Sequence, residues 1–172
     1  YGLREYISVV DPAADGSEEH HDKHGILVMG ADSDGTIYVC NDKTMHGSVA
    51  DCANLAISLY KRYNASCIVV EKNNGGKWIT TVFEQIDKYV SVKEVSASQG
   101  KIARMEPAAA YCQRDKIKFC GVYTELEGQL CSYTGSAGER SPNNYDCLAW
   151  GFHYFSGRYG AVIEESSATG LF

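Results

Sequence analysis

The chain has 172 residues, 44% of them apolar, and a formal net charge of −6. Its size and apolar content suit one domain with a sizeable core, and it shows neither a long apolar run typical of a membrane span nor a secretory signal. The negative charge excludes a protein that coats nucleic acid over its whole surface, because neutralising phosphates takes Lys and Arg. Because no apolar run is long enough for a membrane span, we also expect no membrane partner.

Cysteine usage and the start of the chain indicate its setting. The 7 cysteines form no CxxC pair, so we expect reduced core residues and a reducing compartment, the cytoplasm. The chain begins at Tyr1, almost within an apolar run, which suggests that a further domain precedes it in a longer protein. We expect a single domain over residues 1–172, with a core over about 4–157 and a tail over 158–172.

Three β-rich runs open the chain. The first, Arg4–Val10, ends at Asp11-Pro12, because a proline has no N–H to continue a ladder. After a polar loop come two more runs, Gly25–Ala31 and Thr36–Asn41, joined by a turn that contains Asp34-Gly35. These runs predict an antiparallel meander, with Asp11 at the end of its first strand.

A helix and a buried strand are predicted next. Ser48, with Asp51 three residues on, resembles a capping box, and apolar residues then recur at helical spacing as far as Tyr63. The short run Cys67–Val70 is wholly apolar, as expected of a strand buried on both faces. Glu71 follows it directly, so a second carboxylate also ends a strand.

The rest of the chain alternates between helical and extended patterns. Asn143 or Asn144 is expected to cap the last helix and to place Asp146 in its first turn. Ile117–Phe119 is too short to assign. Helices are predicted over 78–86, 101–114, 123–133 and 144–155, and a strand over 90–95. The order predicts an α/β fold: a mixed sheet, with the antiparallel three-strand meander followed by parallel strands, and helices on both faces.

Asp11, Glu71 and Asp146 are the candidate catalytic residues, because strand ends in such sheets border the usual site. Hard divalent cations relieve the repulsion within a carboxylate cluster, and Mg²⁺ keeps waters for substrate phosphates. Two such ions support in-line hydrolysis of a phosphodiester. We expect Asp11 to bridge the two ions, Mg²⁺ or Mn²⁺, and Glu71 and Asp146 to bind one each. Taken alone, Asp146 fits a solvated loop residue or a charge that interacts with the helix dipole better than it fits a metal ligand.

Five motifs occur in a fixed order along the chain. They are VVDPA (9–13), VVEKN (69–73) with Gly75-Gly76, KIARMEP (101–107), LEGQLC (126–131) and NYDCLAW (144–150). Together they resemble the C-terminal nuclease domain of the tailed-bacteriophage terminase large subunit, which has a ribonuclease-H-like fold. The resemblance extends over about Tyr6–Phe155, which is nearly the whole domain.

The resemblance implies an endonuclease that cuts concatemeric double-stranded viral DNA during genome packaging. It also implies an acid triad of Asp11, Glu71 and Asp146 with two metal ions. The implied partners are an ATPase domain upstream in the same full-length chain, the portal and the small terminase subunit. The implied location is the cytoplasm of the bacterial host, and not the virion as a structural component. The chain itself has no GxxxxGK[ST] phosphate loop, so we expect no ATP hydrolysis from it.

Several other residues have more than one possible role. Asp22 is either a further metal ligand or a solvated loop acid, and His20, His21 and His24 fit exposed loop histidines better than ligands of a soft metal. Trp150 is expected in the core. The candidate DNA contacts are Lys101, Arg104, Lys72 and Asn73, with a solvated helix face as the alternative for Lys101 and Arg104.

Three other functions fit the same pattern. A Holliday-junction resolvase would share the fold and the acids, and would prefer branched DNA. A non-catalytic docking module of the packaging motor would not need three inward carboxylates. A sugar-kinase-like ATPase half is disfavoured because the chain lacks glycine-rich phosphate loops.

Overall fold

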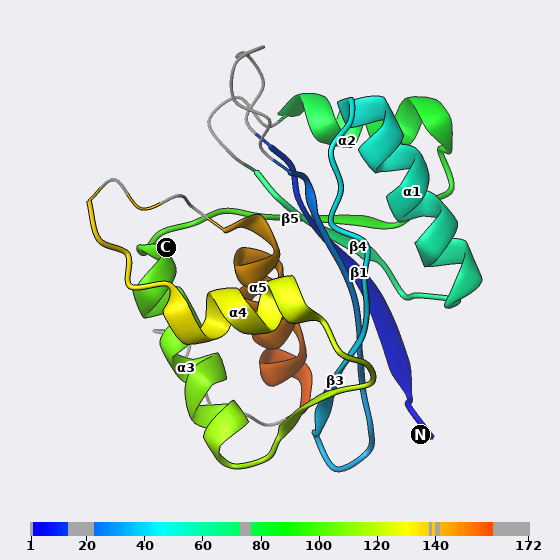
Figure 1. Ribbon diagram of the computed structural model, residues 1–172. Coiled ribbons are helices and arrows are strands. Elements are labelled where there is room, and N and C mark those ends of the chain that lie inside the picture. Colours follow the sequence, from blue (N-terminus) through cyan, green and yellow to red (C-terminus); the bar gives the residue numbers. More distant parts are fainter. Residues whose placement is uncertain (1, 14–22, 73–76, 138, 140–141, 160–172) are drawn as a thin grey trace, which may run out of the picture.

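The computed structural model describes residues 2–13, 23–72, 77–137, 139 and 142–159 (Figure 1). Its centre is a six-stranded sheet in the order β5-β4-β1-β2-β3-β6. The strands are β1 Glu5–Asp11, β2 Gly25–Ala31, β3 Ile37–Asp42, β4 Ile68–Glu71, β5 Val92–Val95 and β6 Ile117–Phe119. The helices are α1 Val49–Arg62, α2 Lys77–Ile86, α3 Lys101–Gln113, α4 Thr124–Ser132 and α5 Asn143–Tyr159.

The sheet is mixed. β1, β2 and β3 form the antiparallel meander, whereas β4, β5 and β6 each pair parallel with a neighbour. Both features of the predicted sheet are therefore confirmed. The short run at Ile117–Phe119, which the sequence left unassigned, is a strand, because pairing with β3 at the sheet edge supplies the hydrogen bonds that three residues cannot supply alone.

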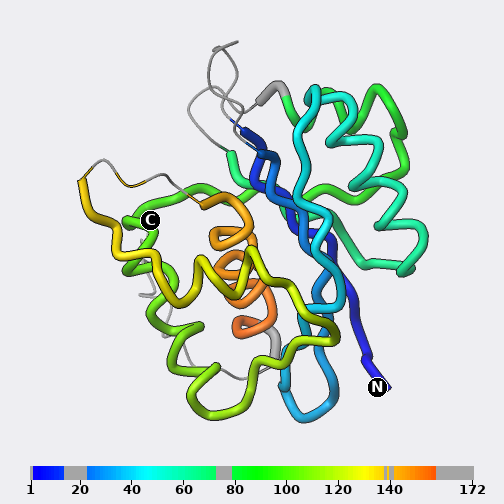
Figure 2. Tube along the Cα trace, in the orientation of Figure 1, coloured from blue at the N-terminus to red at the C-terminus, as the bar shows by residue number. Residues whose placement is uncertain are grey.

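Helices cover both faces of the sheet. Figures 1 and 2 show α1 and α2 on one side and α3, α4 and α5 on the other. Successive strand residues point to opposite faces, so in β1 Val9 packs toward α5 whereas Val10 packs toward α1. Two separate hydrophobic clusters result, one on each face. None of the described helices is long and apolar enough to cross a membrane.

The capping box predicted at the start of α1 is confirmed. Asp51 donates its backbone N–H to Ser48 Oγ at 3.1 Å, and its carboxylate accepts the Ser48 N–H at 3.0 Å. Two N–H groups that the first helical turn leaves unpaired are thereby satisfied. A purely local pattern thus determines where this helix begins.

Two glycines allow α5 to approach the sheet closely. A Cβ on Gly151 would lie 2.2 Å from Met29 Sδ, and one on Gly25 would lie 2.7 Å from the Asn143 carbonyl carbon. Real Cβ atoms essentially never come that near to another atom. The helix therefore rests directly on β1 and β2, and α3 and α4 pack against it from outside.

The start of α5 differs from its prediction. Asn143 is already helical, so neither it nor Asn144 lies at a cap position before the first turn. Their side-chain amides donate elsewhere, from Asn143 to the Lys23 carbonyl and from Asn144 to Asp42 at 3.2 Å. The asparagines therefore fasten the helix to the segment just before β2 and to the end of β3, which lie next to its first turn.

His24 is buried, so the prediction of an exposed loop histidine is wrong for this residue. Its backbone pairs with Met45, and the residue is 3% exposed. The ring accepts the Ala13 N–H at Nδ1 (3.0 Å) and lies 2.9 Å from the Gly47 carbonyl at Nε2. It thereby holds the segment that follows Asp11 against the next loop. His20 and His21 lie outside the described residues.

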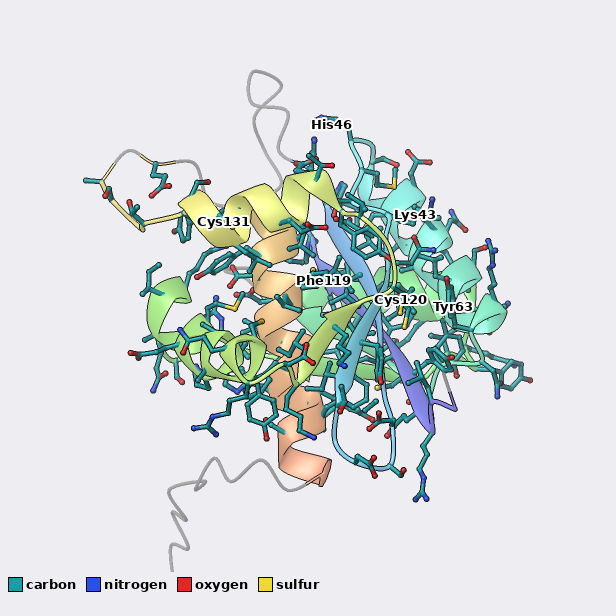
Figure 3. All side chains as sticks on the ribbon, turned by 60° about the horizontal axis from the view of Figure 1, so that its bottom comes forward. Lys43, His46, Tyr63, Phe119, Cys120 and Cys131 are labelled. Carbon is teal, nitrogen blue, oxygen red and sulfur yellow. The ribbon has the colours of Figure 1, made fainter. Side chains whose placement is uncertain are left out.

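All seven cysteines are free. Cys120 and Cys131 are exposed, so the expectation of core cysteines is wrong for these two. Cys120 directly follows the edge strand β6, and Figure 3 labels it beside Phe119. Its sulfur lies 4.0 Å from that of Cys40 on the neighbouring strand. An edge strand has no further neighbour to cover such a side chain.

Candidate metal centre

Asp11 and Glu71 are the last residues of two neighbouring parallel strands. Val10 pairs with Val70 in the register of β1 and β4, so the two acids follow at the same level. Each acid lies two residues after one that faces α5, namely Val9 or Val69. Because side chains alternate along a strand, both carboxylates point to the α5 side. Asp146, in the first turn of α5, meets them there.

The three acids form a compact, buried cluster. One carboxylate oxygen from each lies within 4.8 Å of those from the others. Asp11, Glu71 and Asp146 are 2%, 5% and 0% exposed. Like charges that lie so close together and away from water repel each other strongly, and positive charge must offset this repulsion. An all-oxygen ligand set of this kind matches the preference of hard divalent cations.

Two basic side chains from α3 contact Asp146. The Lys101 ammonium contacts Asp146 Oδ2 and lies 3.9 Å from Asp11 Oδ2. The Arg104 guanidinium lies 2.5 Å from Asp146 Oδ1. Burial alone would lower the pKa of Lys101, but the charges of Asp11 and Asp146, aided by that of Glu71, raise it above the ordinary 10.5. Lys101 is therefore a firmly protonated cation, and the two positive charges leave the three acids one negative charge in excess.

Arg104 faces inward. The residue is 5% exposed, and its NH1 donates to the Gln99 carbonyl at 2.9 Å. Its guanidinium carbon lies 4.6 Å from the centre of the Trp150 ring. The solvated helix face, offered as one reading of Lys101 and Arg104, therefore does not describe Arg104. Helical spacing placed the two residues on one face, but only the packing of α3 on α5 turns that face toward the acids.

Trp150 is a residue of the centre that sequence reasoning placed only in the core. It is buried, at 8% exposed, and its indole N–H donates to Glu71 Oε2 at 2.7 Å. Trp150 follows Asp146 by one helical turn, so both lie on the same face of α5. That spacing is the one sequence signal that could have associated Trp150 with Asp146, and the contact with Glu71 has no such signal.

The other predicted site residues lie apart from the acids or outside the described part of the chain. Lys72 pairs with Glu94 at 3.0 Å, one residue beyond Glu71. Asp22 and Asn73 fall in segments that lie outside the described residues.

Two cysteines report on the surroundings of Asp11. Burial, followed by the charges of Asp11 and Asp146, raises the pKa of Cys147 well above 9.0. Burial and the Asp11 charge likewise raise the pKa of Cys52 to about 12. Both thiols are therefore neutral. They lie in a part of the core that is shielded from water and has a negative electrostatic potential. In such surroundings a cation is bound more strongly than in water.

Comparison with known families places this arrangement in context. The family described as "Terminase RNaseH-like domain" matches residues 8–152. That range contains all three acids. None of the curated protein sequences compared with the chain is significantly similar to it.

Solved structures share the fold at low sequence identity. The large terminase nuclease of the thermophilic phage G20c is 13% identical with a TM-score of 0.63, over 90% of this chain and 82% of that chain. The nuclease domain of the large terminase subunit gp2 of bacterial virus Sf6 is 14% identical with a TM-score of 0.64, over 89% and 90%. The yeast mitochondrial Holliday junction resolvase Ydc2 is 12% identical with a TM-score of 0.56, over 89% and 80%. Other structures of the G20c nuclease hold cobalt or magnesium.

Proposed function

Because the chain belongs to the terminase RNase H-like domain family, we propose that it is a metal-dependent endonuclease that hydrolyses phosphodiester bonds in double-stranded DNA. The observation that carries the proposal is the buried triad of Asp11, Glu71 and Asp146, with ligand oxygens within 4.8 Å of one another. A carboxylate cluster of this kind is costly to bury without positive charge. The excess negative charge that remains beside Lys101 and Arg104 favours binding of a divalent cation.

The three acids would hold two ions, Mg²⁺ or Mn²⁺, with Asp11 as the shared ligand. Ions bound there would supply Lewis acidity for an attacking water and for the leaving 3′ oxygen. The remaining work falls to the protein. The burial of the three acids and of Cys147 next to Asp146 keeps bulk water away from the ligand oxygens. Lys101, with 26% of its side chain exposed, is a cation that would reach both the acids and a phosphate.

The proposed substrate is concatemeric viral DNA, cut during genome packaging in the cytoplasm of the bacterial host. The similarity to large terminase nucleases supports this role. The proposed partners in this role are an ATPase domain in the same full-length chain, a portal and a small terminase subunit. The DNA contacts proposed for Lys101, Arg104, Lys72 and Asn73 stay predictions, as does Asp22 as a further metal ligand. The burial of Arg104 favours a role in positioning Asp146.

A structure-selective resolvase is the second candidate, favoured by the fold shared with the yeast junction resolvase. Both kinds of enzyme would use the same acids, so the triad does not distinguish them. The substrate does, because a resolvase must recognise the branch and not only the duplex. Preference for a four-way junction over linear duplex of the same sequence would favour the resolvase.

Nicking of supercoiled plasmid tests the proposal. The wild-type protein should nick with Mn²⁺ or Mg²⁺ and not with EDTA. Asp11→Asn removes a charge from the shared ligand and should slow nicking more than about 100-fold, beyond the loss typical of residues that only support a ligand. Asp34→Asn makes the same change in an exposed turn and is the matched control, with wild-type nicking expected.

The outcomes separate cleanly. Nicking that persists in EDTA, or an Asp11→Asn protein as active as wild type, would contradict the metal-dependent mechanism. A wild-type protein that binds DNA but never nicks it would favour the docking module.

A further inference from the structure

Trp150 contacts two of the charged groups at the acid cluster at once. Its indole N–H donates to Glu71 Oε2 at 2.7 Å, and its ring lies 4.6 Å from the guanidinium carbon of Arg104. The tryptophan and the glutamate are 79 positions apart in the chain. One side chain of α5 therefore links the end of β4 to α3.

Arg104 in turn is held by one face of α5. Asp146 binds its guanidinium at 2.5 Å, Trp150 stacks on it, and His153 Nε2 lies 2.9 Å from its backbone carbonyl. Residues 146, 150 and 153 follow each other at helical spacing, so all three lie on the same face. Asp146 and Trp150 are thus fixed relative to each other through a shared cation.

The hydrogen bond to Glu71 has a specific electrostatic character. An indole N–H is a neutral donor, so it orients the carboxylate without cancelling its charge. A Lys or Arg at this position would neutralise the glutamate and compete with a metal ion. Because the indole N–H fixes the position of Oε2, it sets the orientation of the whole Glu71 carboxylate next to Asp11 and Asp146.

We propose that Trp150 is a positioning residue that holds the Glu71 carboxylate in one orientation as a metal ligand and holds Arg104 against Asp146. This inference rests on the proposed metal-dependent nuclease function. Without the N–H, the buried Glu71 carboxylate loses its fixed orientation. The ligand set then has to be ordered by the metal itself, which weakens binding.

Metal affinity is the direct test, measured as the decline of the free Mn²⁺ paramagnetic resonance signal during titration of the full chain. Trp150→Phe keeps a ring over Arg104 and removes only the N–H. It should weaken Mn²⁺ binding about 10-fold, as loss of a residue that orients a ligand typically does. Tyr154→Phe is the matched control on the same helix, because it deletes a 2.7 Å hydrogen bond to Glu5, at the far end of β1 from Asp11. It should leave Mn²⁺ affinity unchanged.

The dependence of plasmid nicking on Mn²⁺ concentration distinguishes a defect in metal binding from general damage to the core. Raising the Mn²⁺ concentration should restore the nicking rate of Trp150→Phe to near that of wild type, because only the metal occupancy is lowered. Unchanged Mn²⁺ affinity in Trp150→Phe, with wild-type nicking intact, would overturn the role of Trp150 and leave the proposed function standing. A wild-type protein that neither binds Mn²⁺ nor nicks DNA would overturn both.

A second measurement covers the case in which Trp150→Phe does not fold. The chain has 2 tryptophans, so in a Trp78→Phe protein all tryptophan emission comes from Trp150. Bound Mn²⁺ is paramagnetic and should quench this emission, saturating at the same concentration as binding itself. Emission that does not respond while Mn²⁺ binds would overturn the link between Trp150 and the metal ligands.

Discussion

Gly151→Ala tests the close packing that brings Asp146 to the sheet. The added methyl would lie 2.2 Å from Met29 Sδ and 3.3 Å from Val9 Cγ2. Met29 and Val9 are both fully buried, at 0% exposed. Room can therefore come only from a change in the Met29 side chain or from a shift of α5 away from β1 and β2.

The expected magnitude follows from two opposing effects. Forcing an extra carbon into a packed core costs about 1–3 kcal/mol. Alanine in place of glycine within a helix returns up to about 1 kcal/mol. The free energy of unfolding should therefore fall by up to about 2 kcal/mol, which for a domain of this size lowers the Tm by up to about 8 °C.

Gly157→Ala is the matched control, on the same helix six residues later. Its added methyl meets nothing within 4 Å, so only the gain in helix propensity remains. This variant should raise the Tm slightly, whereas Gly151→Ala should lower it and also slow nicking, because Asp146 moves with α5. Thermal unfolding of the three proteins measures the difference. A Gly151→Ala protein at least as stable as Gly157→Ala would refute the argument that this contact limits the approach of the helix.

Two further predictions concern titratable side chains that contact Asp146 or Arg104, namely Lys101 and His153. Lys101→Met should lower the free energy of unfolding by about 1–3 kcal/mol in EDTA, because the buried carboxylates lose a charged partner. The loss should be smaller in saturating Mn²⁺, because the charge of the metal ion replaces that of the ammonium. Exposed Lys118→Met is the control, and equal losses in EDTA and in Mn²⁺ would contradict the idea that Lys101 and the metal ion bind the same oxygens. Burial, reinforced by the Arg104 charge, lowers the pKa of His153 below 6.5 despite an opposing hydrogen bond to the Arg104 backbone. The unfolded chain then binds the proton more readily, so wild type should lose stability as the pH falls below about 6.5, and the stability difference between wild type and His153→Gln should shrink. Urea unfolding at pH 5.5 and 8 measures this, with exposed His46→Gln as control, and a pH-independent difference would contradict it.

Local patterns in the sequence determined most of the fold. The proline after Asp11 ends β1, the pair Ser48 and Asp51 begins α1, and the apolar run before Glu71 forms β4. Each of these signals acts within a few residues, through backbone hydrogen bonding or side-chain periodicity. The same signals placed two acids at the ends of strands, and so predicted which edge of the sheet carries the candidate site.

Only the tertiary structure decided what surrounds those acids. The contact between Trp150 and Glu71 joins residues from different elements, and no periodicity encodes it. The inward direction of Arg104 depends on how α3 packs against α5, and the reach of Asp146 depends on Gly151 fitting over Met29. Such contacts form because hydrophobic packing brings distant segments together, after which buried charges and donors must find partners among whatever neighbours they meet. Residue order therefore determined the acids, and packing determined the cations and the indole that hold them.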